Sequence, residues 1–275
     1  MQSMNTTIQK QKKGSIKPAD LPDWLLSHGL RVITTEECAH LIGVPQIEVP
    51  QRLVRLRKKG KLISPARGLW IVVSPQYLEM GAPEPIEYIH QLMTYYGCEY
   101  CVGWLSAASL SGASHQAPQV FQVAVDKPLR EKTIGRSTLQ FYYRSYVSEI
   151  SKNRLVLTNG SAFTSTPGAT MLMVSADVGI CAGIDNAATI ISEMAQEHDD
   201  YMKDVVSNMM LFPVSAVCRL GWILDHVADS DGLEKLEEYC RAISSPAILA
   251  PGSNRSGKID KRWNIIENRI VEADI

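Results

Sequence analysis

The fold of the N-terminal part is decided by the stretch Ile33-Thr-Thr-Glu-Glu-Cys-Ala-His-Leu-Ile-Gly-Val-Pro45, continued by Arg52-Leu-Val-Arg-Leu-Arg-Lys-Lys-Gly-Lys-Leu62 and Arg67-Gly-Leu-Trp-Ile-Val-Val73. Its pattern predicts a short amphipathic helix, a turn containing glycine, a second helix that ends at glycine, and a two-stranded ribbon. This order of elements is typical of a winged helix-turn-helix, which places one helix in the DNA major groove and a ribbon beside it.

Capping residues set the expected helix boundaries. A first helix should begin near Pro22 and stop at Gly29. Thr34 and Thr35 are candidate N-caps of the next helix, which should end at Gly43. A third helix is expected over residues 50–59. Its opening proline should hold the preceding residue, Val49, in an extended conformation.

The third helix is the expected recognition helix. Leu53 and Leu56 share one face and should anchor it, while polar and basic residues occupy the other faces. We assign Gln51, Arg52 and Arg55 to base reading, and Lys58, Lys59 and Lys61 to the phosphate backbone. The alternative is a solvated basic face. Six basic residues among the ten at 52–61 favour DNA.

Strand-forming residues at 61–64 and 68–73 predict the wing, and its turn should present Arg67 to the minor groove or to a phosphate. Prolines and glycines then gather in residues 74–85, so we expect a linker and a domain boundary near residue 82. Residues 1–20 are expected to be a flexible basic arm, and residues 21–82 the DNA-binding domain.

Charge divides the chain in the same way. Residues 1–80 carry twelve Lys and Arg against six Asp and Glu, a net of +6, and the remainder has a net of −7. A basic part followed by an acidic part indicates that only the first faces phosphate. The N-terminus does not resemble a secretory signal, and we expect a cytoplasmic protein with no membrane association.

Residues 83–275 predict a larger mixed α+β domain, so the fold class is α+β with an N-terminal winged helix-turn-helix. Thr166 and Pro167 should cap and open a helix in its middle. The other elements are expected as a helix at 85–96, a small-residue helix at 103–113, strands at 120–125, 139–143 and 154–157, helices at 186–197, 200–211, 214–228 and 232–243, and short closing segments at 247–250 and 263–265.

No constellation in this domain predicts chemistry, so we expect no catalytic residue, cofactor or metal, and no enzyme. His198-Asp199-Asp200 could bind a metal, but a solvated helix start explains it better. Ser114-His115-Gln116 is better explained as a helix end, and Cys98 and Cys101 as buried thiols than as zinc ligands. Asp225 and His226 are adjacent on a helix and should point in different directions.

Several blocks together resemble the AbiEi-family antitoxins. They are Val49-Pro-Gln-Arg-Leu-Val-Arg-Leu-Arg-Lys-Lys-Gly60, Ser64-Pro-Ala-Arg-Gly-Leu-Trp70, Pro75-Gln-Tyr77, Gly103-Trp-Leu-Ser-Ala-Ala108, His115-Gln-Ala-Pro-Gln-Val-Phe-Gln-Val123 and Arg262-Trp-Asn-Ile-Ile-Glu-Asn268. The likeness runs from about residue 21 to the end. It departs at Leu110-Ser-Gly-Ala-Ser114, where the family pattern has a histidine before the glycine.

The resemblance implies the antitoxin of a type IV toxin–antitoxin pair, associated with abortive infection against phage. Such a protein binds inverted repeats of double-stranded DNA in its own promoter and represses its operon. Its C-terminal domain counters a nucleotidyltransferase-like toxin, usually without forming a stable complex. A ligand-sensing winged-helix regulator without a toxin partner is the alternative. An enzyme recruited to DNA, such as a nuclease, is a third and less favoured hypothesis.

Overall fold

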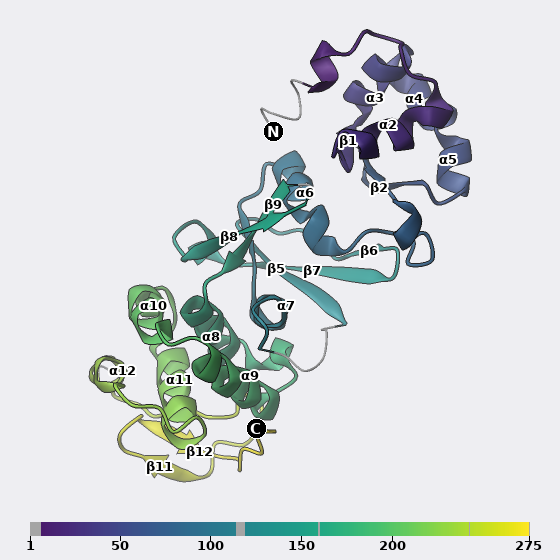
Figure 1. The fold of residues 1–275 in the computed structure, drawn as a ribbon. Helices are drawn as coiled ribbons and strands as arrows, with labels where there is room; N and C mark the ends of the chain where they lie inside the picture. Colours follow the sequence, from purple (N-terminus) through teal and green to yellow (C-terminus); the bar gives the residue numbers. More distant parts are fainter. Residues whose placement is uncertain (1–6, 114–118, 159, 242, 275) are drawn as a thin grey trace.

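The computed structural model describes residues 7–113, 119–158, 160–241 and 243–274. The protein is a mixed α+β molecule, as the sequence predicted. Its N-terminal helices lie at one end, a six-stranded sheet lies in the middle, and a group of helices lies at the other end (Figure 1).

The N-terminal part contains short helices packed on a three-stranded antiparallel sheet of order β1-β3-β2. A reciprocal capping box begins the second helix: the Thr34 hydroxyl accepts a hydrogen bond from the Glu37 amide at 3.2 Å, and the Glu37 carboxylate accepts one from the Thr34 amide at 2.8 Å. Gly43 ends that helix with φ +71°, which confirms both expected boundaries. The elements are α2 (Leu21–Ser27), β1 (Val32–Thr34), α3 (Thr35–Ile42), α4 (Val49–Arg52), α5 (Val54–Lys58), β2 (Leu62–Ala66) and β3 (Leu69–Val72).

The expected single helix over residues 50–59 is divided into α4 and α5. Leu53 lies between them with φ −90° and ψ 0°, outside ideal helical geometry. The expectation that Val49 is extended was wrong, because it has φ −52° and ψ −49° and begins α4. A 3-10 turn, η2 (Gln46–Glu48), leads directly into α4. Complete burial of the Val49 side chain stabilises a conformation that the following proline disfavours.

Residues 7–20 lie against α3, which differs from the flexible arm that we expected. Ile8 and Ile16 are buried in the core of the N-terminal part. The amides of Gly14 and Ile16 donate hydrogen bonds to carbonyls at the end of α3. Gly14 also lies so close to Gly43 that a Cβ atom on Gly43 would be 2.7 Å from the Gly14 Cα. Burial of the two isoleucines thus holds this segment against the core, although its composition is basic.

The central sheet has the strand order β6-β7-β5-β4-β9-β8, with β5 parallel to β7 and β4 parallel to β9. The expected strands at 120–125, 139–143 and 154–157 are confirmed as β5, β7 and β8. The other three strands were not predicted. The bounds are β4 (Tyr100–Val102), β5 (Val120–Val125), β6 (Lys132–Ile134), β7 (Ser137–Tyr143), β8 (Lys152–Leu157) and β9 (Gly160–Ser165).

Alternation along β5 separates two apolar cores. Val123 and Val125 pack with α6 (Ile89–Tyr96) on one face of the sheet. Ala124 faces the second core, which contains α7 (Trp104–Leu110) and α8 (Pro167–Ala176). Because successive side chains of a strand point to opposite faces, one short strand supports both cores.

The far end of the molecule is built around α8, whose residues from Gly168 to Ser175 are all buried. Thr166 was expected to cap α8, but its side chain makes no capping hydrogen bond. Asp204 instead accepts from the Gly168 amide at 2.7 Å and the Ala169 amide at 3.2 Å. The remaining elements are α9 (Ile184–Glu197), α10 (Tyr201–Asn208), α11 (Val214–His226), α12 (Glu234–Cys240), β10 (Ala247–Ile248), β11 (Lys258–Asp260) and β12 (Ile265–Glu267).

The N-terminal sheet and the central sheet share one apolar core. Val32, Leu69 and Ile71 from the outer face of the N-terminal sheet belong to the same buried cluster as α6 and β5. Ala82, at the expected domain boundary, is buried in this cluster as well. The segment expected to be a linker is therefore packed, and a division of the chain near residue 82 stays a prediction.

Candidate nucleic-acid interface

The basic residues assigned to DNA lie on an amphipathic α4–α5 pair. Val49, Leu53 and Leu56 are buried and fix the two helices to α3 and the N-terminal sheet. The side chains on the opposite face are exposed, and they are those of Gln51, Arg52, Arg55, Lys58 and Lys59. The helices therefore present their polar face to solvent because three apolar side chains hold the other face.

Four of these side chains line one groove of about 800 Å³ between α4–α5 and the 3-10 turn η1 (Pro18–Asp20). The residues of the groove are Lys17, Pro18, Ala19, Gln51, Arg52, Val54, Arg55, Leu56 and Lys59. Lys17 was predicted only as one charge of the arm. Its place beside α4–α5 follows from the burial of the neighbouring Ile16 in the N-terminal core.

The two arginines of the groove differ in their partners. Arg52 forms an ion pair of 2.8 Å with Glu48, one turn earlier in the chain, and both side chains are about half exposed. Within the described residues Arg55 forms no ion pair. The carboxylate of Glu48 therefore competes with any external anion for Arg52, whereas Arg55 has no such competitor.

The wing residues lie outside this groove. Lys61 is half-buried directly before β2, and Arg67 is exposed at the turn between β2 and β3. The Arg67 carbonyl accepts a hydrogen bond of 2.8 Å from the hydroxyl of Tyr95 on α6. Gly68 has φ +88°, and a Cβ atom there would lie 2.5 Å from the same hydroxyl. The turn between β2 and β3 is thus fixed against α6, while the Arg67 side chain is exposed.

Comparison with known proteins identifies the second part of the chain. Residues 101–226 match the family model of the AbiEi antitoxin C-terminal domain. We call these matched residues the AbiEi domain. The match confirms the resemblance to the AbiEi-family antitoxins, and it covers the six-stranded sheet and α7 to α11. The basic groove lies outside the matched residues.

The comparison with curated proteins gives no match. Among solved structures, the RV2827C protein from Mycobacterium tuberculosis is similar, with a TM-score of 0.62 and 13% sequence identity over 90% of each chain. At this identity the likeness shows a shared fold. It extends beyond the AbiEi domain to nearly the whole chain.

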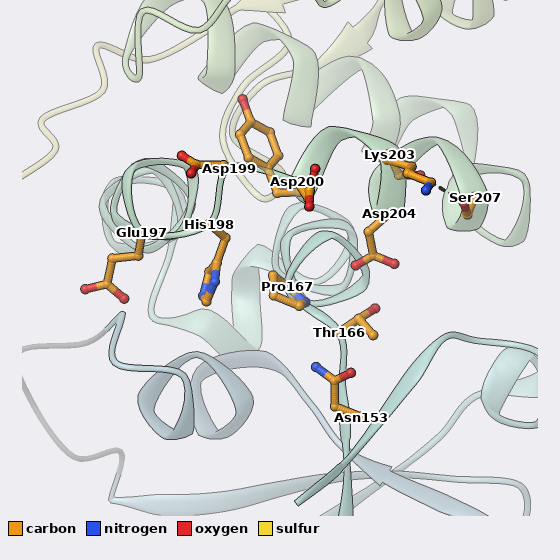
Figure 2. A pocket seen from close by; sticks show the side chains of 11 residues that line it. Asn153, Thr166, Pro167, Glu197, His198, Asp199, Asp200, Lys203, Asp204 and Ser207 are labelled. Carbon is orange, nitrogen blue, oxygen red and sulfur yellow. Dashed lines mark hydrogen bonds between the residues drawn. The ribbon is translucent and has the colours of Figure 1, made fainter.

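The AbiEi domain contains a second hollow, of about 650 Å³, where α9 ends and α10 begins (Figure 2). His198, Asp199 and Asp200 line it, but their side chains point in different directions. Among the described residues they are not part of any group with metal-ligand spacing. The alternative of a solvated helix start is therefore the better description. Ser114-His115-Gln116 lies outside the described residues.

Cys98 and Cys101, around the start of β4, do not form a zinc site in the part of the chain that the structure describes. Both are buried, and burial raises the pKa of Cys98 to about 11 and that of Cys101 to about 12. The Cys98 thiol contacts a carboxylate oxygen of Asp126 at 3.0 Å. These are buried protonated thiols, as the sequence suggested. None of the helices in the described ranges is long and apolar enough to cross a bilayer.

Proposed function

We propose that this protein is an AbiEi-type antitoxin that represses its own operon through an N-terminal winged helix-turn-helix. The AbiEi domain supports the antitoxin half of the proposal. The order α3, α4–α5, β2 and β3 supports the other half, because it is the order of a helix-turn-helix followed by a wing. In this arrangement α4–α5 is the recognition element.

The basic groove is the observation that carries the DNA-binding role. It presents a glutamine, two arginines and an apolar side chain together at one surface. Arginine reads guanine and glutamine reads adenine through paired hydrogen bonds in the major groove. Val54, which is 41% exposed, is placed to contact a thymine methyl group. Gln51, Arg52, Arg55 and Val54 are therefore the proposed base-reading residues.

Lysines on the rim of this surface would neutralise phosphates. Lys58 is the last residue of α5, Lys59 and Lys61 follow it, and Lys17 lies directly before η1. Lysine contacts of this kind position a protein on the duplex without reading its sequence. Arg67 at the wing turn would enter the minor groove or bind a phosphate beside it. Inverted repeats in the promoter would bind two copies of the protein, one on each half-site.

In this proposal the AbiEi domain counters a nucleotidyltransferase-like toxin without a stable complex. The acidic balance of the chain after residue 80, a net of −7, suits a part that stays away from DNA. The protein acts in the cytoplasm by binding rather than by catalysis, and the proposed function requires no cofactor.

The first experiment measures binding of the purified protein to the DNA upstream of its own gene and to random duplex across a salt series. We expect tighter binding to the upstream fragment and a strong decrease in affinity with salt, because basic side chains displace counterions from the phosphates. Equal affinity for both DNAs at every salt concentration would refute the repressor role and leave the basic groove as solvated surface.

A second experiment expresses the neighbouring toxin gene with and without this protein. We expect growth to be restored by the antitoxin, while the two purified proteins elute separately on size exclusion. The hollow at α9 and α10 favours one alternative, a ligand-sensing regulator. Promoter binding without growth rescue, changed by substitution of His198, would support that alternative over an antitoxin.

A further inference from the structure

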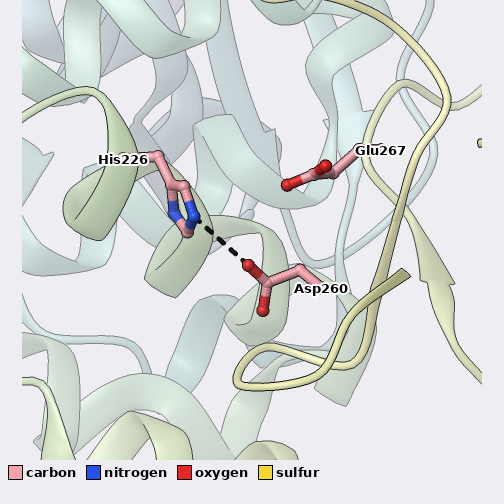
Figure 3. Close-up of side chains that lie close together, drawn as sticks. All are labelled: His226, Asp260 and Glu267. Atoms are coloured by element: carbon pink, nitrogen blue, oxygen red, sulfur yellow. Dashed lines mark ion pairs between the residues drawn. The ribbon is translucent and has the colours of Figure 1, made fainter. Parts of the chain in front are cut away.

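Three potential metal ligands meet where the end of α11 faces the C-terminal strands. His226 is at the end of α11, Asp260 is the last residue of β11, and Glu267 is the last residue of β12 (Figure 3). One ligand atom from each residue lies within 4.8 Å of the others. Asp260 and Glu267 follow the histidine by more than thirty residues, so no local pattern indicates this cluster.

The spacing suits a single bound ion. His226 Nε2 and Asp260 Oδ2 are 3.2 Å apart. Zinc holds nitrogen and oxygen ligands at about 2.0–2.2 Å, so that ligand atoms around one ion lie roughly 3–3.5 Å from each other. The histidine–aspartate pair already has this separation. A ligand atom of Glu267 lies within 4.8 Å of the other two, and the long side chain of Glu267 allows it to move closer and complete the set.

Each of the three ligands is oriented by a contact to its other polar atom. His226 Nδ1 lies 3.2 Å from the Trp222 carbonyl, which can only accept a hydrogen bond. The Trp263 amide donates to Asp260 Oδ1 at 2.9 Å, and the Trp222 indole donates to Glu267 Oε1 at 3.1 Å. Metal ligands in proteins are typically held in this way by partners outside the coordination sphere.

The orientation of His226 has a chemical consequence. When Nδ1 carries the proton and donates it to the Trp222 carbonyl, the Nε2 lone pair of a neutral imidazole faces a carboxylate oxygen of Asp260. Two lone pairs at 3.2 Å repel each other unless a cation lies between them, whereas in the other tautomer the Nε2 proton is donated to Asp260. A divalent cation would in addition offset the second carboxylate, Glu267.

The surroundings of the three ligands are rigid. Trp222 stacks on the His226 ring, with centroids 4.8 Å apart and an interplanar angle of 7°. Trp263, between β11 and β12, is fully buried and packs on Gly221 of α11, where a Cβ atom would lie 2.0 Å from its ring. Its indole donates to Asp225 at 2.7 Å. An ion here would therefore find the histidine–aspartate pair already in place.

Asp225 is close to the cluster and corrects one sequence-based expectation. The two adjacent side chains were expected to point in different directions, yet Asp225 Oδ2 lies 3.5 Å from the histidine Nδ1. Both oxygens of Asp225 have other partners, because Arg262 binds Oδ1 at 2.6 Å and the Trp263 indole binds Oδ2. Asp225 thus supports the histidine from the side away from Asp260.

We propose that His226, Asp260 and Glu267 bind a divalent transition-metal ion, with Zn²⁺ as the best-suited candidate, and so connect β11 and β12 to α11. Imidazole favours zinc and its neighbours over magnesium or calcium, and two carboxylates balance the charge of the ion. His226 is 36% exposed, which leaves room for a water ligand. This site departs from the expectation that the protein holds no metal, and it is independent of the proposed DNA binding.

The test is zinc binding by the full-length, tag-free protein, measured against a chromophoric zinc indicator after treatment with a chelator. We expect one equivalent of Zn²⁺ to bind and to raise the melting temperature. His226→Gln and Glu267→Gln should weaken that binding at least tenfold. His198→Gln, which changes a half-buried histidine of the second hollow, is the matched control and should bind zinc like the parent protein.

Trp222→Phe tests the orienting contacts without removing a ligand. It keeps an aromatic ring over His226 but loses the hydrogen bond to Glu267, and we expect roughly 10-fold weaker zinc binding. Circular dichroism and melting in chelator confirm that each variant folds. Absence of a one-equivalent site, or equal zinc affinity in parent, His226→Gln and Glu267→Gln, would overturn the proposal and leave only the direct contact between His226 and Asp260. Tighter binding of Mg²⁺ than Zn²⁺ would overturn the transition-metal assignment.

Discussion

The exposed arginines of α4–α5 in the N-terminal part differ in their partners from three arginines of the second part of the chain. In the second part, Arg144 pairs with Asp177 at 2.8 Å, Arg262 pairs with Asp225, and Arg219 is buried against backbone carbonyls. In the first part, Arg55 has no ion pair among the described residues, and Arg52 has an exposed one. Net charge therefore indicates which part of the chain can attract DNA. Which individual arginines are available to bind DNA depends on the partners that each of them already has within the protein.

The largest effect is expected from replacing Arg219, a buried arginine that forms hydrogen bonds within the protein. It is 5% exposed and donates to the carbonyls of Ser175, Ile248 and Leu249, joining α8, α11 and β10. Burial lowers its pKa to about 10, so it is charged at neutral pH. Arg219→Met keeps much of the volume but leaves buried carbonyls unpaired, and should lower the free energy of unfolding by roughly 3–5 kcal/mol.

Chemical denaturation measures this effect, and Arg241→Met is its control. Arg241 is also an arginine with a close acidic partner, Glu237, but its side chain is 71% exposed. Exposed pairs contribute about 0–1 kcal/mol. If the two substitutions destabilise the protein equally, the distinction between the buried Arg219 and the exposed Arg241 is wrong.

A second prediction tests how separate the two parts are. Ile33 and Ile71 are both almost fully buried on neighbouring strands of the N-terminal sheet, but they lie on opposite faces. Ile33 packs in the N-terminal core, and Ile71 packs in the core shared with α6 and β5. Each Ile→Ala change should cost about 2–5 kcal/mol through lost burial and the cavity that remains.

The difference between these two variants should appear in hydrogen exchange. Ile33→Ala should increase exchange in α2 and α3, whereas Ile71→Ala should also increase it in α6 and β5. Confinement of both effects to residues before 82 would show that the shared core does not couple the two parts. Because of this core, we also expect a chain without residues 1–82 to expose apolar surface.

Local patterns in the sequence predicted much of the fold and little of the long-range organisation. The Thr34 N-cap and the alternation in β5 involve residues close in the chain, and both were predicted correctly. β9 was missed because its residues, Gly160–Ser165, are mostly small and polar, and it becomes a strand by pairing with β8 and β4. The apolar core that residues before and after position 82 share could not be predicted from local patterns either.

The same limit applies to the sites. The exposed face of α4–α5 followed from helical spacing, and its assignment to DNA stays a prediction. Lys17 joins that face only because Ile16 is buried against α3. The cluster of His226, Asp260 and Glu267 depends on the return of β11 and β12 to the end of α11, which no local pattern reveals. Sites within one helix were accessible to sequence reasoning, and those between distant elements were not.

A third prediction compares an available arginine with an occupied one. Arg55→Ala should weaken binding to the promoter fragment by about 1–3 kcal/mol and relax base preference at one position, because a paired hydrogen bond to a base is lost. Arg262→Ala, in the second part, should leave DNA binding unchanged. Quantitative gel shifts with base-substituted fragments measure both. A loss of the same size for random duplex would assign Arg55 to phosphate binding instead.

Lys58→Ala should have a smaller effect of a different kind. As a phosphate contact, Lys58 should contribute to all DNA sequences alike, and its removal should reduce the slope of log K against log salt by about one unit. The measurement is the slope for promoter and random fragments across a salt series. An unchanged slope would show that Lys58 does not contact a phosphate.

The smallest expected effect comes from Glu48, the acid that holds Arg52. Glu48→Gln should tighten promoter binding by up to about fivefold at low salt, because it frees Arg52 and removes a negative charge beside the groove. The effect is this small because an exposed ion pair of this kind contributes at most about 1 kcal/mol. The gain should disappear in the Glu48→Gln, Arg52→Ala double variant and decline as salt screens the charges. Glu36→Gln, on α3, gives the background effect of removing one acid from the N-terminal part. If Glu48→Gln instead weakens binding, the ion pair orients Arg52 for DNA rather than competing with it, and Arg52 and Arg55 would then be equivalent despite their different partners.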